Sequence, residues 1–341
     1  MRWRRRDRPL VDARGPSRPG VAGLTLGGGI GYLARGHGLS IDNLVSADIV
    51  LADGGFVTAS DCEHEDLFWA LRGGGGNFGV VTSLEFALHP VKDIYGGPMF
   101  FELEEAENVF RFFRNYITDA PEEMGVFPAF QIAPPLPFIP EDRHGDTFIA
   151  LVGCWAGPID EGENAFKPFH DVAPVVAEMI GPMPYPALNS AFDPLVPPGL
   201  QHYWKAAFVK ELTDDAIAAH VKHGPDVPYV SSTMHVYPIN GAAHRVPADA
   251  TAFGHRDANF AMVIAGMWAD PGQNERNIGW VREYYDAIAP HSEEGAYINF
   301  AAGDDQARVI ENYGANYARL RAVKRAYDPD NVFHLNQNIR P

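Results

Sequence analysis

The chain has 341 residues, of which 46% are hydrophobic and 21% charged, a composition typical of a globular protein with a sizeable core. Its formal net charge of −17 argues against nucleic-acid binding, because a phosphate backbone is held by a basic surface. No stretch approaches the roughly 18 consecutive apolar residues of a membrane-spanning helix, so no membrane partner is expected.

Residues 1–19 carry seven arginines and show neither a helical nor a strand period, so we predict a disordered leader. No apolar stretch follows the arginines, which argues against a secretory signal peptide. The two cysteines, Cys62 and Cys154, lie far apart and lack CxxC spacing. This pattern suits a reducing compartment, and we expect a cytoplasmic protein.

The sequence changes at Gly20 to GVAGLTLGGGIG, in which six of twelve residues are glycine. Glycine lets a backbone approach a ligand closely, and successive N–H groups in such a loop can hold an anion. We therefore predict a tightly packed loop that binds a phosphate-bearing cofactor, with a purely structural turn as the alternative. The Rossmann pattern is not met, because Pro16 and Pro19 stand where its strand should be.

The next segment alternates short strands with one helix. We predict strands at 47–52, 56–59 and 80–88, with Asp53-Gly54-Gly55 as a hairpin turn between the first two. A helix is expected at 65–72 because its apolar residues fall on one face. The four glycines at 73–76 end that helix and favour a turn over a phosphate-binding loop.

Residues 91–300 are predicted to form a second unit in which helices cover one face of a sheet. The expected helices are 104–117 and 277–288, and the expected strands are 147–154, 228–236 and 259–268. The other face of the sheet is expected to meet a ligand. A further helix at 316–327 ends at Asp328-Pro329, because proline does not continue a helix.

Several aromatic residues of this unit, Tyr203, Trp204, Tyr237 and Trp268, could line an apolar slot for a ring-bearing substrate, although an aromatic residue in a strand is more often core. His220 and His223 have helical spacing, but no third ligand stands at motif spacing. We interpret these two histidines as surface residues, and no metal site is expected.

Four stretches, at 23–44 (GLTLGGGIGYLARGHGLSIDNL), 52–86, 246–260 (VPADATAFGHRDANF) and 313–339, together resemble one family. The chain is similar to the berberine-bridge-enzyme-like FAD-linked oxidases, which share the vanillyl-alcohol-oxidase (PCMH-type) flavin-binding fold. The resemblance implies an α+β protein with a partial FAD-binding domain and a substrate domain, whose large antiparallel sheet has helices on one face. It assigns 20–91 to the second half of the FAD-binding domain, 92–300 to the substrate domain, and 301–341 to a C-terminal segment that returns to the FAD domain.

The resemblance also implies an FAD site and a reaction. Cofactor-binding residues are expected at Val21, Gly23, Gly27, Gly28, Gly29, Gly31, Gly38, Leu39, Asn43, Gly79, Val80, Val81, Asn299, Asn336 and Asn338. Hydride would pass from an organic alcohol, a sugar or a ring-bearing natural product to FAD, with dioxygen as acceptor and hydrogen peroxide as product. Tyr297 is the candidate base. Position 300 is Phe, where several relatives have a second tyrosine, which argues against the usual polyol chemistry.

The chain departs from the family pattern at its N-terminal end. Relatives begin with a subdomain that supplies a flavin-linked histidine, and some have a linking cysteine just before the glycine loop, where this chain has Pro16-Ser17-Arg18-Pro19. We therefore expect an N-terminally truncated member without a covalent flavin bond. Two alternatives stay open: an active oxidase, and an inactive remnant that lacks the covalent-flavin subdomain.

Overall fold

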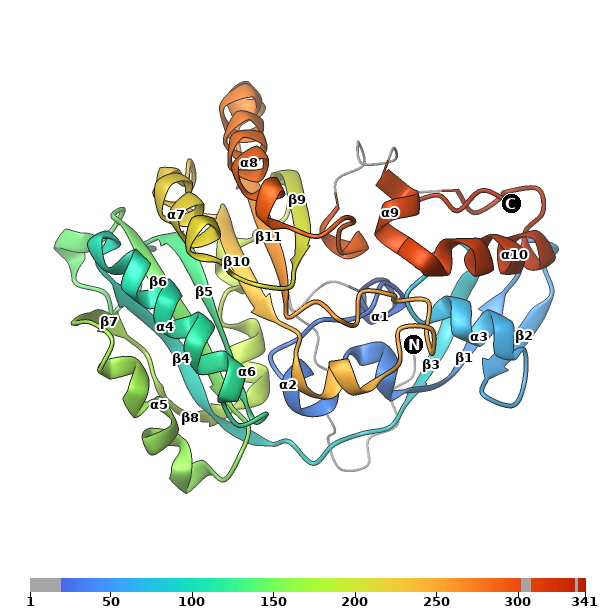
Figure 1. The fold of residues 1–341 in the computed structure, drawn as a ribbon, viewed down its shortest axis with the longest axis horizontal. Helices are drawn as coiled ribbons and strands as arrows, with labels where there is room; N and C mark the ends of the chain where they lie inside the picture. The colour runs from blue at the N-terminus through green and yellow to red at the C-terminus, as the bar shows by residue number, and fades with distance from the viewer. Residues whose placement is uncertain (1–19, 302–307, 335–336) are drawn as a thin grey trace.

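The structure is a computed structural model that describes residues 20–301, 308–334 and 337–341. The expected leader at 1–19 and the expected cofactor residue Asn336 lie outside these residues. In the described part of the chain, a three-stranded and an eight-stranded antiparallel sheet are combined with helices (Figure 1). This arrangement confirms the predicted α+β class with a large antiparallel sheet.

The smaller sheet follows the glycine-rich segment and has the strand order β2-β1-β3. Its strands are β1 (Leu44–Val50), β2 (Phe56–Ser60) and β3 (Val80–Phe86). The predicted hairpin turn is present, with Gly54 at a φ of +84° and the N–H of Gly55 donating to Asp53 Oδ1. Helix α3 (Glu65–Leu71) ends before Gly73, whose N–H donates to the carbonyl of Leu26, so the glycines at 73–76 pack against the glycine-rich segment.

The larger sheet has the order β7-β4-β6-β5-β10-β11-β9, and β8 also pairs with β4. The strands are β4 (Asp93–Phe101), β5 (Met124–Ile132), β6 (Thr147–Trp155), β7 (Val175–Glu178), β8 (Gly181–Pro184), β9 (Gln201–Val209), β10 (Thr233–Pro238) and β11 (Phe260–Trp268). Helices α4 (Ala106–Asp119), α5 (Gly162–His170), α7 (Asp214–His223) and α8 (Asn274–Ile288) pack on one face (Figure 1). The amphipathic stripe of α4, with Val109, Phe110, Phe113 and Ile117 buried, explains this packing.

Alternation along the strands gives the sheet two different faces. On β11, Met262 and Ile264 face the helices, whereas Ala261 and Val263 face the other way. That second face is not open throughout. The glycine-rich segment covers part of it through Ile30, Tyr32, Leu33, Leu39 and Ile41, and helix α6 (Tyr185–Ser190) also packs there.

The C-terminal segment packs on the smaller sheet. Helix α9 (Val309–Tyr313) leads into α10 (Tyr317–Tyr327), and α10 lies beside α3 (Figure 1). Leu320 and Val323 of α10 share one buried cluster with Phe68 of α3 and Leu26. Residues from both ends of the described chain therefore build one core. None of the helices in the described ranges combines the length and apolar character needed to span a bilayer.

Three local predictions differ from the structure. The segment at 20–31 was expected to be a loop, but it begins as helix α1 (Val21–Leu26), because Thr25 and Leu26 bury one side of a helical turn. The strand expected at 228–236 begins only at Thr233, since the N–H of Ser232 closes a turn onto Tyr229. His220 was interpreted as a surface residue but is 1% exposed beneath α8, where it contacts Tyr284.

Candidate functional site

The glycine-rich segment makes a sharp bend after α1. Gly28 and Gly29 have φ values of +137° and +82°, which residues other than glycine rarely adopt. A Cβ on Gly27 would lie 2.1 Å from Asn299 Oδ1, and one on Gly29 would lie 2.3 Å from Ser40 Oγ. The bend therefore needs glycine because the chain packs tightly against itself here.

Tyr297 ties this bend to the C-terminal part of the chain. Its phenol oxygen accepts hydrogen bonds from the N–H of Gly29 at 2.8 Å and of Ile30 at 3.4 Å. Asn299 Nδ2 donates to the same oxygen at 2.8 Å and to the carbonyl of Leu24 at 2.8 Å. Four of the expected site residues, Gly27, Gly29, Tyr297 and Asn299, thus form one cluster, although 268 positions separate Gly29 from Tyr297.

Burial dominates the electrostatics of Tyr297, which is 1% exposed. Burial disfavours the charged phenolate and raises the pKa of Tyr297 to about 12, although the donors on Gly29, Ile30 and Asn299 act in the opposite direction. The phenol is therefore neutral at physiological pH, and it accepts hydrogen bonds from a ring of N–H donors.

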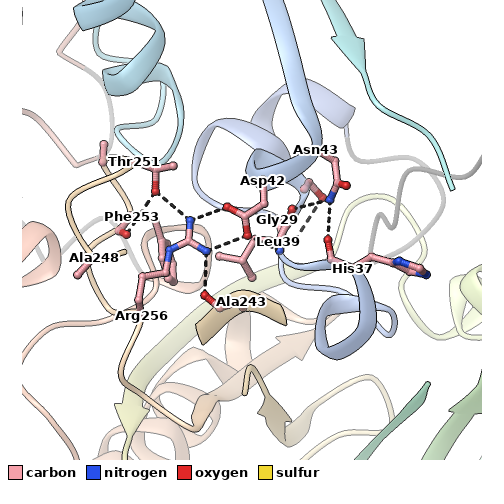
Figure 2. Close-up of polar contacts among 12 residues, drawn as sticks. Gly29, His37, Leu39, Asp42, Asn43, Ala243, Ala248, Thr251, Phe253 and Arg256 are labelled. Carbon is pink, nitrogen blue, oxygen red and sulfur yellow. Dashed lines mark hydrogen bonds and ion pairs between the residues drawn. The ribbon is translucent and has the colours of Figure 1, made fainter. Parts of the chain in front are cut away.

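The turn at Gly38–Asn43 lies against the bend (Figure 2). Gly38 has a φ of +76°, and the N–H of Leu39 donates to Asp42 Oδ2 at 2.8 Å to start the short 3-10 helix η1 (Ser40–Asn43). The N–H groups of Ser40 and Ile41 donate to the carbonyls of Gly29 and Gly28, at 2.9 and 3.1 Å. The turn therefore sets the direction of the glycine carbonyls.

The side chain of Asn43, an expected cofactor residue, forms hydrogen bonds with neighbouring protein groups. Its Nδ2 donates to the carbonyls of His37 and Leu39, at 2.9 and 3.0 Å. Its Oδ1 lies 2.6 Å from His89 Nε2. Asn43 therefore holds the turn together (Figure 2).

Asp42 and Arg256 form a buried ion pair that no sequence motif predicted (Figure 2). Arg256 Nη1 and Nη2 donate to Asp42 Oδ2 and Oδ1, at 2.8 and 2.7 Å. The side chains are 3% and 8% exposed. Two features of the sequence point to this pair. Asp42 stands close to the apolar residues Ile41 and Leu44, and Arg256 lies in the family-like stretch at 246–260, to which no role was assigned.

Other expected site residues lie in different surroundings. Gly79, Val80 and Val81 lead into the edge strand β3, where a Cβ on Gly79 would meet the carbonyl oxygen of Val50. Val80 is 56% exposed there. Asn338 is partly buried in the tail, next to Gln337, whose carbonyl accepts from Asn77 Nδ2 and whose Oε1 accepts from Asn312 Nδ2. The described part of the tail is thus held by the turn at 73–77.

The four aromatic candidates divide between the two faces of the large sheet. Trp204 and Tyr237 lie on the face of Tyr297, and Phe300 contacts both rings, with centroids 6.1 and 5.8 Å away. Tyr237 also contacts His235 Nδ1. Tyr203 and Trp268 face the helices, where they meet Arg282 and Asn274 respectively. Only the first two can belong to a site beside Tyr297.

Two features near the bend fit a polar cofactor. Gly23 on α1 is exposed, and, apart from its chain neighbours and the backbone of α1, no described atom lies within 4 Å of the place where its Cβ would be. Thr25 Oγ1 is buried, and within the described ranges no group bonds to it. A buried hydroxyl without a partner is unfavourable, so an added polar group is expected beside it. Among the described residues, no group of three or more His, Cys, Asp or Glu could hold a metal ion.

Known proteins match this chain in sequence over most of its length. Residues 296–340 match the family described as "Berberine and berberine like". The chain is 30% identical over 332 residues to the uncharacterized FAD-linked oxidoreductase YgaK of Bacillus subtilis, covering 94% of this chain and 70% of YgaK. It is 33% identical over 343 residues to the FAD-linked oxidoreductase fogF of Aspergillus ruber, covering 94% of this chain and 67% of that protein.

Two solved structures share the fold. Glucooligosaccharide oxidase from Acremonium strictum has a TM-score of 0.82 at 22% identity, over 98% of this chain and 74% of that one. Aclacinomycin oxidoreductase also has a TM-score of 0.82 at 22% identity, over 98% of this chain and 77% of that one. At this identity the likeness concerns the fold alone.

Proposed function

Because the chain belongs to the berberine-bridge-enzyme-like family of FAD-linked oxidoreductases, we propose that it is an oxidase for an organic alcohol, a sugar or a ring-bearing natural product. FAD bound to this chain would supply the acceptor for a hydride from the substrate carbon, and its reoxidation by dioxygen would give hydrogen peroxide. One observation carries the proposal: the phenol of Tyr297 joins Asn299 to the glycine bend at Gly29. A cofactor along the bend would therefore lie next to a polar, titratable side chain.

We propose that FAD lies along α1 and the bend that follows it. Val21 and Gly23 offer a partly exposed surface, and the hydroxyl of Thr25 lacks a partner among the described residues. Residues 20–91 and 301–341 would form the FAD-binding part and 92–300 the substrate part. The buried cluster that joins Leu26, Phe68 and Leu320 supports this division.

Tyr297 is the proposed proton acceptor for the substrate hydroxyl. The N–H donors of Gly29 and Ile30 and the amide of Asn299 would stabilise a phenolate at this position. With a pKa of about 12 in the protein alone, ionising Tyr297 at pH 7 costs about 7 kcal/mol. Tyr297 would therefore act as a phenolate: it first releases its own proton to solvent, at this cost, and then takes the proton of the substrate hydroxyl.

A second tyrosine on the same face provides a matched comparison. Tyr237 contacts His235 Nδ1, and its ring packs on Phe300, which in turn packs edge-on against Tyr297 with centroids 4.8 Å apart. A phenol paired with an imidazole can hand its proton on, because histidine titrates near neutral pH. Tyr237 is therefore the alternative proton acceptor.

The proposed substrate carries a ring. Trp204, Tyr237 and Phe300 group aromatic surface on the sheet face next to Tyr297. The indole N–H of Trp204 is buried, and no described residue accepts its hydrogen bond, so it could bind a substrate oxygen. A glucooligosaccharide oxidase and an aclacinomycin oxidoreductase share the fold, so sugars and ring-bearing natural products are the first substrates to test.

The cytoplasm is the proposed location. Cys62 is exposed, Cys154 is buried in β6, and neither is part of a disulfide. Cysteines that are not joined in a disulfide suit a reducing compartment.

The test is a reconstitution experiment with two matched variants. Purified protein is titrated with FAD, and anaerobic bleaching of the flavin absorbance is followed with a panel of sugars and aromatic glycosides. Hydrogen peroxide is then measured after air is admitted. We expect bleaching with at least one ring-bearing substrate, and Tyr297→Phe should lower its rate at least about 100-fold, the range of a general base.

Tyr237→Phe is the control. If Tyr297→Phe bleaches at the wild-type rate and Tyr237→Phe does not, Tyr237 is the proton acceptor and Tyr297 is cleared of that role. If no substrate bleaches the flavin of the wild-type protein, the oxidase proposal is wrong. Visible spectra of the variants with FAD show whether cofactor binding survives each substitution.

A further inference from the structure

Arg256 lies in the stretch 246–260, which resembles the family but has no place in the proposed reaction. Its guanidinium is buried and forms a fork with the carboxylate of Asp42, 214 positions earlier in the chain. On its other side, Nη2 donates to Thr251 Oγ1 at 2.9 Å and Nη1 to the carbonyl of Ala243 at 3.4 Å (Figure 2). The guanidinium thus connects the loop at 243–256 to the turn at Gly38–Asn43.

Stability alone is a weak reason for this arrangement. Two charges lose their hydration on burial, and apolar residues of similar volume often serve a core equally well. Arg256 Nε is also buried, and no described atom accepts its hydrogen bond. The fork instead imposes one defined geometry on the two segments that it joins, because both of its N–H···O bonds must be formed together.

The geometry that the pair defines is that of the glycine bend. Asp42 receives the N–H of Leu39 as well as both arms of Arg256, so its carboxylate fixes the start of η1. The next two N–H groups, of Ser40 and Ile41, bond the carbonyls of Gly29 and Gly28. Arg256 is therefore linked to the bend through Asp42, which bonds the N–H of Leu39, and through the neighbouring N–H of Ser40, which bonds the carbonyl of Gly29.

The same loop presses on the bend directly. Phe253 lies under the guanidinium of Arg256, 5.2 Å from ring centroid to Cζ. A Cβ on Gly28 would lie 3.1 Å from the ring of Phe253, and the N–H of Phe253 bonds the carbonyl of Arg72 at 3.2 Å. Arg256 and Phe253 therefore hold Gly28 from two sides.

We propose that Arg256 is a positioning residue, which acts through Asp42 to hold the Gly28–Gly29 bend in the conformation that receives FAD. The inference rests on the proposed function, since it assigns the bend to FAD. It adds a residue that touches neither substrate nor cofactor and sets the affinity for the cofactor from a distance.

The test separates positioning from general stability with three variants and a control. Arg256→Gln and Asp42→Asn each leave one buried charge without its partner, whereas the double variant contains neither charge. Arg245, which lies near the same loop, forms a second forked pair with Glu122. Its side chains are 62% and 38% exposed, against 3% and 8% for Arg256 and Asp42. Glu122→Gln is therefore the matched control.

For each protein, the dissociation constant for FAD is measured by flavin fluorescence well below the melting temperature of the protein without FAD. We expect Arg256→Gln and Asp42→Asn to lower the melting temperature and to weaken FAD binding at least 10-fold, or about 1.4 kcal/mol. The double variant should regain most of the melting temperature, because no charge is left unpaired, yet bind FAD at least 10-fold more weakly than the wild type. Arg256→Lys should lie between them, since an ammonium does not form a fork. Glu122→Gln should change neither quantity.

Hydrogen exchange of the protein without FAD provides an independent readout. The amides of Ser40 and Ile41 should exchange faster in Arg256→Gln and in the double variant, and at the wild-type rate in Glu122→Gln. An FAD affinity that recovers together with the melting temperature in the double variant would overturn the inference, as would unchanged exchange of these amides. Wild-type protein that does not bind FAD would instead overturn the proposed function, and the exchange data would still decide whether Arg256 holds the bend.

Discussion

His220 shows how strongly burial lowers the pKa of a single histidine in this molecule. Its ring stacks on Phe110 with centroids 5.1 Å apart, and Nδ1 lies 2.8 Å from the hydroxyl of Tyr284. Burial, with a smaller contribution from His291, lowers the pKa of His220 to about 3. The i, i+3 spacing of His220 and His223 does not indicate which of the two faces the core, because that depends on how α7 packs against α8.

Because the pKa of His220 is lowered in the folded protein, the free energy of unfolding should decrease as the pH is lowered. In the unfolded chain His220 binds a proton below about pH 6.5, whereas the folded protein excludes it down to about pH 3. The free energy of unfolding should therefore be highest above pH 6.5 and fall by up to about 1.4 kcal/mol per pH unit below it. Urea unfolding at pH 7, 6 and 5 measures this slope.

The double variant His220→Phe/Tyr284→Phe should flatten the slope. It replaces both polar partners by rings of similar shape, so no buried hydrogen-bonding group is orphaned. Between pH 6.5 and 5, the wild type should lose about 1 to 2 kcal/mol more than the double variant. Parallel curves for the two proteins would show that His220 does not cause the acid sensitivity.

At the scale of elements, helix α10 carries a fully buried pair. Lys324 Nζ donates to Asp328 Oδ2 at 2.5 Å and to the carbonyls of Asn77 and Phe333 at 2.7 and 2.6 Å, and both charged side chains are 0% exposed. Burial alone would raise the pKa of Asp328, but Lys324 and the N–H groups of Val332 and Phe333 outweigh it and hold the pKa below its usual value. The pair joins α10, the tail and the turn at 73–77.

Lys324→Met should destabilise the protein by about 3 to 5 kcal/mol, because it leaves the Asp328 carboxylate buried without its counter-charge. Adding Asp328→Asn should restore part of the loss, since the amide oxygen can still accept an N–H group. Arg111 on α4 provides the control: its pair with Glu107 has the same i, i+4 spacing but is exposed, and so is its pair with Asp214 of α7. Arg111→Met should leave the free energy of unfolding nearly unchanged, because exposed ion pairs contribute little to stability. Equal losses for Lys324→Met and Arg111→Met in urea unfolding would contradict this role.

At the scale of the whole molecule, Arg35 joins the glycine-rich segment to the large sheet. It lies on α2 (Ala34–His37), and its Nη groups donate to the carbonyls of Ile117, Ala120, Pro121 and Met124 around the end of α4, while Nε donates to Asn240 Oδ1. The last carbonyls of a helix lack partners within the helix and attract positive charge. The Arg35 side chain thus caps the C-terminal end of α4 and connects the glycine-rich segment to the large sheet.

Arg35→Met should lower the free energy of unfolding by roughly 3 to 5 kcal/mol, because several buried carbonyls lose their donor together. Hydrogen exchange should rise in both 27–43 and 106–124, since Arg35 joins these segments. Arg35→Lys retains the charge but has three donors in place of five, so its loss should be smaller. If exchange rises in one segment only, Arg35 does not couple the two regions.

Much of the fold could be predicted from the sequence because its causes are local. Apolar periodicity predicted α4 and α8 to within three residues at each end, and the turn at Asp53–Gly55 and the end of α10 before Asp328 follow from glycine and proline. The resemblance to a family then paired the glycine-rich segment with Tyr297 and Asn299, and the structure brings these residues into contact.

The rest of the site depends on contacts between distant parts of the chain. Strand alternation puts Tyr203 and Trp204 on opposite faces, but only the packed sheet shows that Trp204 shares its face with Tyr297. The partner of Arg256 is 214 positions away, and no local pattern predicts it.

The sequence by itself therefore determined the family and most of the helices and strands, since these depend on neighbouring residues and short motifs. Tertiary structure decided which side chains are buried and paired, as at His220 and in the Asp42–Arg256 and Lys324–Asp328 pairs. The reason is physical: the ionisation and the hydrogen bonds of a side chain depend on what packs around it, and here those neighbours come from other elements of the chain.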